Sequence, residues 1–210
     1  MKTARDYGPY AKLMRHAAIR RLIAVLNAAS REAKVTYMVL GGSAVYLHTR
    51  RNPVDYPDLD LIVDGTKAQA KRLVSALGRR VRLKADKWAE TETDVFFKLS
   101  YRGFDIDLFT SQEERPTLGL PVMIGKVPVR RIEGLIAEKL QRFSYPDILM
   151  LFDLLRKKYD RAMVMRFAHE NNAASRLVTL QRIVAARASV ASMRRWAAIM
   201  AGGERRGHIV

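Results

Sequence analysis

The sequence predicts a fold of the α/β or α+β class, in which a mixed sheet is flanked by helices. An all-helical C-terminal domain is expected to follow it. Three observations predict it. Apolar, β-branched runs alternate with helically spaced segments in the first 130 residues. Two of these runs, separated by Arg102-Gly103, indicate a hairpin. From Arg131 onward the apolar residues recur only at helical intervals. We therefore expect an α/β core over residues 1–130, including an N-terminal helix, and a helical domain over residues 131–210.

The first elements alternate between helix and strand. Residues 9–33 have helical apolar spacing, and residues 35–40 are apolar and β-branched, which predicts a buried strand that ends at a glycine pair. A short helix is expected to start with residues 44–48 and to be broken by residues 50–53. The apolar residues that follow Pro57 and Asp58 indicate the next buried strand.

The rest of the core ends in strands and loops. Gly65-Thr66 is expected to open a helix that stops near Gly78. The two hairpin strands are expected over residues 93–101 and 104–109. Residues 111–130 contain several prolines and are expected to be loop-rich, with a short strand around residues 122–124.

The helical half shows two apolar stripes and further helical segments. Residues 160–200 are expected to form two or three helices. The stripes consist of Ile132, Leu135, Ile136 and Leu140, and of Ile148, Leu149, Leu151, Phe152 and Leu155.

The charge points to a polyanionic partner. The formal net charge is +17 over 210 residues, and lysine and arginine release condensed counterions from nucleic acid. The alternative is a generally arginine-rich lineage in which the charge serves only solubility. An acidic membrane surface is a weaker candidate, since no segment combines a basic face with a broad aromatic one.

The composition excludes several classes of site. The chain contains no cysteine, which excludes disulfides, thiolate zinc sites and a cysteine nucleophile. The N-terminus lacks the apolar core of a signal peptide, and no apolar run reaches the roughly 18 residues of a membrane span. Hydrophobic residues make up 49% of the chain, so a real core is possible. We expect a folded, cytoplasmic protein without a membrane partner.

The turn Gly41-Gly42-Ser43 lies between a predicted strand and a predicted helix. Glycines let the backbone approach phosphate closely, and the start of a helix offers N–H groups and a positive dipole end. Ser43 could bind a phosphate oxygen. A plain strand-to-helix turn with Ser43 as the N-cap explains the same residues.

Two pairs of carboxylates follow the glycine turn. Asp58 and Asp60 are two residues apart in one predicted strand, and Asp105 and Asp107 are two apart in another, so each pair should share a face. An exposed edge strand would explain one such pair. If the strands are neighbours, three carboxylates can hold two divalent cations about 4 Å apart, as in two-metal phosphoryl transfer. Carboxylate-rich oxygen sites suit Mg²⁺ or Mn²⁺, which indicates nucleotidyl transfer from an NTP.

These residues resemble a known family in their order along the chain. Gly41-Gly42-Ser43-Ala44, then Asp58-Leu59-Asp60-Leu61, then Asp107-Leu108 are similar to the polymerase-β-type nucleotidyltransferase superfamily, which carries Gly-Ser, a spacer, Asp-X-Asp and a later third Asp. The run 132–142 is similar to the Leu-Ile-Ala-X-Lys-Leu helix of its AbiEii/MenT-like toxin branch. The resemblance covers about residues 35–155.

The resemblance implies roles for individual residues, with a nucleotidyltransferase-like fold for the core. Gly41, Gly42 and Ser43 would contact the NTP, Asp58 and Asp60 would bind metal, and Asp107 would be the third carboxylate, with Asp105 as the alternative. Lys139 would reach the NTP phosphates from the helical half. Asp147 and Asp153 both compete for the place of an acidic residue that follows the lysine helix. Arg50 and Arg51 could bind the triphosphate or an acceptor strand, or belong to a solvated loop.

The implied function is the transfer of an NMP from an NTP to an RNA acceptor, the 3′ end of tRNA, with release of pyrophosphate. Such an enzyme would act as a toxin of a toxin–antitoxin or phage-defence system and could have a cognate antitoxin protein as its partner. Two alternatives stay open. One is NMP transfer to the hydroxyl of a protein or small molecule, and the other is a catalytically inactive member that binds nucleic acid or acts like an antitoxin.

Overall fold

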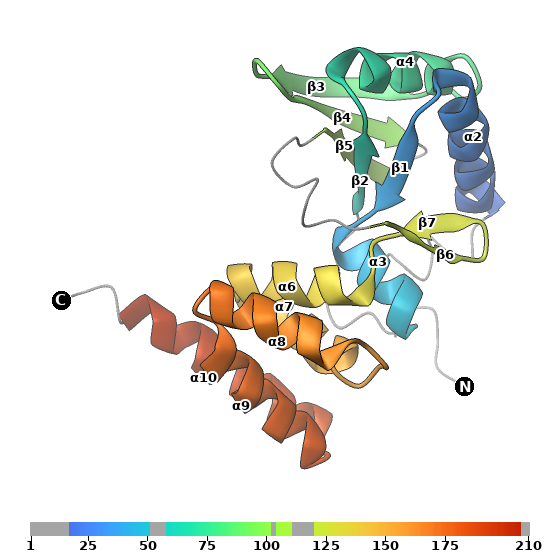
Figure 1. The fold of residues 1–210 in the computed structure, drawn as a ribbon. Coiled ribbons are helices and arrows are strands. Elements are labelled where there is room, and N and C mark those ends of the chain that lie inside the picture. The colour runs from blue at the N-terminus through green and yellow to red at the C-terminus, as the bar shows by residue number, and fades with distance from the viewer. Residues whose placement is uncertain (1–16, 51–57, 102–103, 111–119, 207–210) are drawn as a thin grey trace.

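The computed structural model describes residues 17–50, 58–101, 104–110 and 120–206 (Figure 1). Its centre is a mixed seven-stranded sheet with the strand order β3-β4-β5-β2-β1-β7-β6. The predicted fold class, a mixed sheet with helices and a helical C-terminal part, is confirmed. The strands are β1 (Thr36–Val39), β2 (Asp58–Asp64), β3 (Lys84–Glu90), β4 (Val95–Tyr101), β5 (Phe104–Phe109), β6 (Val122–Ile124) and β7 (Val127–Val129).

Strand β2 lies in the middle of the sheet and has two different neighbours. It pairs with β1 antiparallel and with β5 parallel, and the latter register sets Asp60 beside Asp107. Strands β4 and β5 form the predicted antiparallel hairpin. Strands β2 and β5 are adjacent, so the condition on which a shared site of the two acidic strands depended is met.

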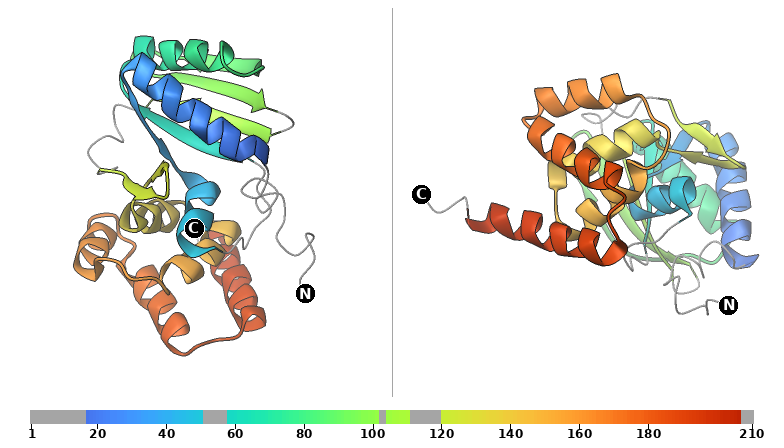
Figure 2. Two further views of the ribbon diagram at one scale, coloured as in Figure 1. Left: turned by 90° about the vertical axis from the view of Figure 1, so that its right-hand side faces the viewer. Right: turned by 90° about the horizontal axis from the view of Figure 1, so that it is seen from below.

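Two helices cover one face of this sheet, α2 (Ala17–Ala33) and α4 (Lys67–Gly78). The left view of Figure 2 shows both helices over the strands, and they contact each other. Leucines of both helices, Leu22 and Leu26 in α2 and Leu73 and Leu77 in α4, are buried in the same core. Helix α4 begins after the N-cap Thr66, which forms a capping box with its N3 residue.

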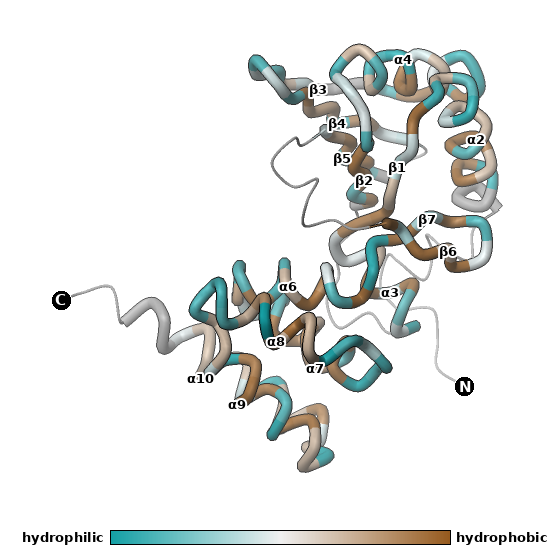
Figure 3. Tube along the Cα trace, in the orientation of Figure 1, coloured by the Kyte–Doolittle hydropathy of each residue, from teal (hydrophilic) through white to brown (hydrophobic). Residues whose placement is uncertain are grey.

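The remaining helices lie at the end of the sheet where β1 runs into α3 (Gly41–Thr49). One apolar core is continuous from α2 through the sheet to the last helix. Figure 3 shows apolar residues along the strands and hydrophilic ones in the turns β3–β4 and β6–β7. The helices that lie at this end of the sheet beside α3 are α6 (Ile132–Arg142), α7 (Tyr145–Leu154), α8 (Arg161–Glu170), α9 (Ala174–Ala185) and α10 (Val190–Arg206). Within the described residues, no helix is long and apolar enough to cross a membrane.

The structure differs from the sequence-based expectations at three elements. Helix α3 begins at Gly41 rather than at Ala44, so the glycines form its first turn. Strands β3 and β7 were not expected, since β3 is an edge strand whose sequence is largely polar and β7 contains Pro128 in a proline-rich region. The expected helix over residues 9–33 is described only from Ala17, and its earlier part lies outside the described residues.

Candidate active site

The backbone at the start of α3 is in close contact with Asp60 of β2. The Leu40 N–H donates a hydrogen bond of 2.9 Å to the carbonyl oxygen of Asp60. Gly41 has a φ of +59°, and a Cβ atom at this position would lie 1.8 Å from Oδ2 of Asp60. Glycine is therefore required both for the backbone angle and for the space that the carboxylate occupies.

The first turn of α3 carries the amide groups of the glycine turn. Leu40 is the N-cap and makes no side-chain capping bond, so the interpretation of Ser43 as the N-cap is wrong. Ser43 lies inside the first turn and is buried. The early N–H groups of a helix and its dipole attract anions. The turn beside Asp60 can therefore receive a phosphate oxygen.

The parallel register of β2 and β5 pairs each aspartate of one strand with an aspartate of the other. Asp60 is paired with Asp107, and Asp58 is paired with Asp105. Neighbouring positions in adjacent strands place their side chains on the same face of the sheet. Oδ1 of Asp107 is buried, whereas Asp105 is exposed. The backbone of Asp58 belongs to β2, but its side chain lies outside the described part of the structure.

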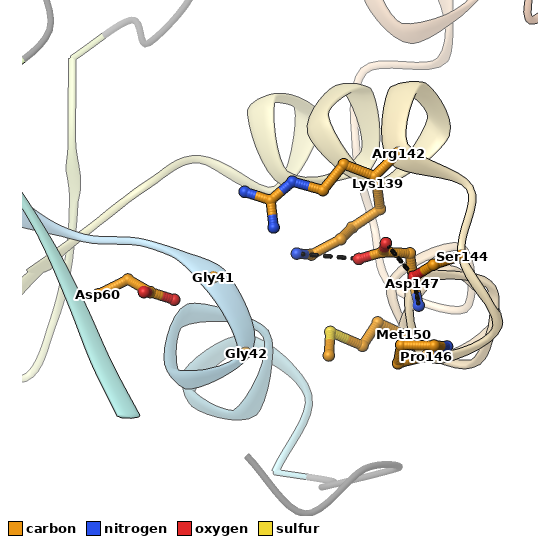
Figure 4. A pocket seen from close by; sticks show the side chains of 9 residues that line it. All are labelled: Gly41, Gly42, Asp60, Lys139, Arg142, Ser144, Pro146, Asp147 and Met150. Atoms are coloured by element: carbon orange, nitrogen blue, oxygen red, sulfur yellow. Dashed lines mark hydrogen bonds and ion pairs between the residues drawn. The ribbon is translucent and has the colours of Figure 1, made fainter. Parts of the chain in front are cut away.

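A cavity of about 290 Å³ opens between Asp60, the start of α3 and the helices α6 and α7. Figure 4 shows Lys139 and Arg142 extending from α6 toward Gly41 and Asp60. Both halves of the chain therefore contribute to one site. The cavity is lined by Gly41, Gly42, Asp60, Lys139, Arg142, Ser144, Pro146, Asp147 and Met150.

Lys139 is buried although it carries a charge, with only 2% of its surface exposed. Its Nζ lies 2.8 Å from Oε1 of Glu138 and 3.2 Å from Oδ1 of Asp147. Asp147 also accepts a hydrogen bond from Oγ of Ser144, the N-cap of α7. A buried ammonium needs such partners, because an unpaired buried charge is very unfavourable. The two carboxylates hold Lys139 at the cavity wall.

A second buried cation, Arg130, fixes the other side of Glu138. Its guanidinium lies 3.1 Å from Oε2 of Glu138, and its carbonyl oxygen lies 2.8 Å from Nε2 of His48 in α3. A Cβ atom at Gly134 would lie 2.8 Å from Nε of Arg130, so glycine leaves room for the guanidinium. Sequence reasoning missed Arg130, Glu138 and Arg142, because their proximity to the site depends on how α6 docks. The only signal was their closeness to Lys139 in the sequence.

Other predicted candidates lie elsewhere. Asp153 is in the same helix as Asp147, but it pairs with Arg156 at 3.3 Å and does not line the cavity. Arg50 is the exposed C-cap of α3, with a φ of +59°, and it does not line the cavity either. Arg51 lies outside the described residues.

The donor set suits a hard divalent cation. Asp60 and Asp107 offer carboxylate oxygens from adjacent positions of two strands, which are the ligands that Mg²⁺ and Mn²⁺ prefer. Among the described side chains, which exclude that of Asp58, no group of three metal-ligating residues is close enough to hold an ion. The backbone register also pairs Asp58 with Asp105, two residues before the pair of Asp60 and Asp107, so the residue types present fit such a site.

Comparison with known proteins supports the fold. No protein-family model and no curated protein matches the sequence. The structure of JHP933 from Helicobacter pylori matches with 15% identity and a TM-score of 0.51, covering 90% of this chain and 93% of that one. A candidate nucleotidyltransferase from H. pylori matches with 14% identity and a TM-score of 0.50, covering 88% and 93%. The likeness shows a nucleotidyltransferase-like fold.

Proposed function

We propose that this protein is a metal-dependent nucleotidyltransferase that moves an NMP from an NTP to an RNA acceptor. One observation carries the proposal: the carboxylate of Asp60 lies against Gly41, beside Asp107 in the register, and faces Lys139 across a cavity. Each of these residues was expected from the sequence to contact the NTP or its metal. Gly41, Asp60 and Lys139 line one cavity and Asp107 is paired with Asp60 in the neighbouring strand, which supports a common substrate.

The residues suggest a division of roles in the reaction. The first turn of α3 binds phosphate oxygens through its N–H groups, and Lys139 neutralises charge on the triphosphate from the opposite wall. Asp58, Asp60 and Asp107 would hold the divalent cations, with Asp105 as the more exposed alternative to Asp107. Such cations supply neutralisation of the triphosphate charge and a lowered pKa of the acceptor hydroxyl.

The transfer itself is an in-line displacement. The acceptor hydroxyl releases its proton to solvent, and its oxygen forms a bond to the α-phosphorus. The bond from that phosphorus to the bridging oxygen breaks, and pyrophosphate leaves with the electron pair. Catalysis of this kind rests on positioning and on charge stabilisation. Asp147 serves this positioning, because it holds Lys139 by an ion pair of 3.2 Å.

Charge beside the carboxylates favours RNA as the acceptor. The antiparallel register pairs Lys98 of β4 with Asp107, so this exposed lysine shares the face of the carboxylates. Lys84 of β3 extends the same face, because it is paired with Ser100, which in turn is paired with Asp105. Together with the net charge of +17, these lysines suit a phosphate backbone. By resemblance to the AbiEii/MenT-like branch, the acceptor would be the 3′ end of tRNA and the protein a toxin with a cognate antitoxin.

The test is a labelling experiment. The purified protein is incubated with α-labelled NTPs, Mg²⁺ and total tRNA, in parallel with Asp60→Ala. We expect label in tRNA with the unmodified protein only, and arrest of cell growth that the variant relieves. Label in protein or in an added aminoglycoside, without label in RNA, would replace the RNA acceptor by one of these. Absence of transfer and of Mg²⁺-dependent NTP binding, together with tight RNA binding, would indicate an inactive nucleic-acid-binding protein.

A further inference from the structure

Arg142 lies in the cavity without any role derived from the sequence. It belongs to the last turn of α6, three residues after Lys139, so both side chains leave the same face of the helix. Figure 4 shows its guanidinium extending beside the Lys139 ammonium, toward Gly41 and Asp60. Its side chain is 66% exposed, whereas that of Lys139 is 3% exposed. Arg142 is thus a solvated cation at the wall of a proposed NTP site.

Glu138 connects Arg142 to the buried cations. Its carboxylate lies 3.1 Å from Arg130, 2.8 Å from Lys139 and 3.5 Å from Arg142. All three cations thus contact the carboxylate of Glu138, and Lys139 also contacts that of Asp147. The contact with Arg142 is the longest of the three, and Arg142 is the most exposed of the cations. Arg142 can therefore turn from Glu138 to a ligand with a smaller loss of ion-pair energy than Arg130 or Lys139.

We propose that Arg142 binds the β- and γ-phosphates of the NTP. This inference rests on the proposed function, because it assumes an NTP in the cavity. The reacting α-phosphate must lie near the carboxylates of β2 and β5, so the outer phosphates extend toward the opposite wall, where α6 presents Lys139 and Arg142. A guanidinium can bind two phosphate oxygens at once, which an ammonium cannot do with the same geometry.

The competing explanation is a helix-end arginine that only favours the negative end of the α6 dipole. Arg131, at the other end of α6, supplies a matched control. Its Nε lies 3.5 Å from Glu133 and its side chain is 49% exposed, but it does not line the cavity. Both exposed arginines therefore make a 3.5 Å ion pair with a largely buried glutamate of α6, and of the two only Arg142 lines the cavity.

The experiment compares the binding of each NTP and of its monophosphate, in the presence of Mg²⁺, by calorimetry on the full chain. We expect Arg142→Ala to weaken NTP binding by about 10- to 100-fold, the loss of one charge-assisted hydrogen bond or a pair, and NMP binding by much less. Arg142→Lys should restore part of the affinity, and Arg131→Ala should leave both affinities unchanged. Thermal melts of all variants verify folding.

The outcomes separate the two proposals. If the unmodified protein binds NTP and Arg142→Ala behaves like Arg131→Ala, the role of Arg142 is refuted and the proposed function stands. Equal losses for NTP and NMP would also refute it, since the contact would not be with the outer phosphates. If the unmodified protein binds no NTP at all, the proposed function fails and the role of Arg142 fails with it.

Discussion

Replacing Gly41 with alanine is expected to disable the site by displacing Asp60. The new Cβ atom would lie 1.8 Å from Oδ2 of Asp60, whereas ordinary contacts begin near 3.4 Å, so the carboxylate must move by about 1.5 Å. The φ of +59° adds a cost of about 1–2 kcal/mol for any L-residue with a Cβ. Since a misplacement of about 1 Å can lower a rate roughly 100-fold, transfer activity should fall at least that far.

Gly125→Ala separates the backbone effect from the steric one. Gly125, in the turn between β6 and β7, has a φ of +64°, and a Cβ atom there would meet no atom within 4 Å. It should therefore lose about 1–2 kcal/mol of stability, which lowers the Tm by roughly 2–8 °C in a chain of this size, and keep its activity. Gly41→Ala should lose more stability than this control, together with its activity.

The assay is thermal unfolding combined with label transfer from an α-labelled NTP. If Gly41→Ala matched Gly125→Ala in both measurements, the close approach between the glycine turn and Asp60 would not matter for function. That result would refute the reasoning that assigns Gly41 to the site by its contact with Asp60.

Three further predictions concern buried groups. Lys139→Met removes the buried ammonium from between its two carboxylate partners and should cost about 3–5 kcal/mol in urea unfolding; a loss below about 1 kcal/mol would contradict the paired burial. Gly134→Ala should cost about 1–3 kcal/mol, because it pushes against the Arg130 guanidinium at 2.8 Å, and an unchanged Tm would contradict this. Tyr37→Phe removes a 2.8 Å hydrogen bond to Asn27 and should cost about 1 kcal/mol near neutral pH. Burial raises the pKa of Tyr37, so the wild type should lose stability as the pH rises above about 10, where only the unfolded phenol ionises; unfolding followed against pH should show a smaller alkaline loss in the variant.

The positions of the buried strands along the chain were partly predictable, because hydrophobic patterns identify such strands. Asp58 and Asp60 lie in β2 and Asp105 and Asp107 in β5, as the two-residue spacing indicated. The choice between Asp105 and Asp107 was not available from the sequence, because both have the same parity. In the structure the register pairs Asp107 with Asp60 and Asp105 with Asp58, and Asp107 is less exposed than Asp105. Register depends on long-range packing, which local spacing does not encode.

The contribution of the helical half was less predictable. Asp147 and Asp153 are equivalent candidates in the sequence, and the docking of α7 gives them different surroundings, since it brings Asp147 to Lys139 and leaves Asp153 with Arg156. The burial of Lys139 likewise depends on the neighbouring helix and not on its own surroundings in the sequence. The edge strand β3 escaped prediction because its largely polar residues resemble a loop.

Binding of Mn²⁺ in the presence of NTP, measured by electron paramagnetic resonance, tests the carboxylate site directly. We expect a bound ion in the wild type and a strongly weakened one in Asp60→Asn and Asp107→Asn. Asp64→Asn, at the far end of the same strand, is the control and should bind the ion normally. If all four proteins bound Mn²⁺ with equal affinity, the carboxylates of β2 and β5 would not hold the cation, and the proposed site would be contradicted.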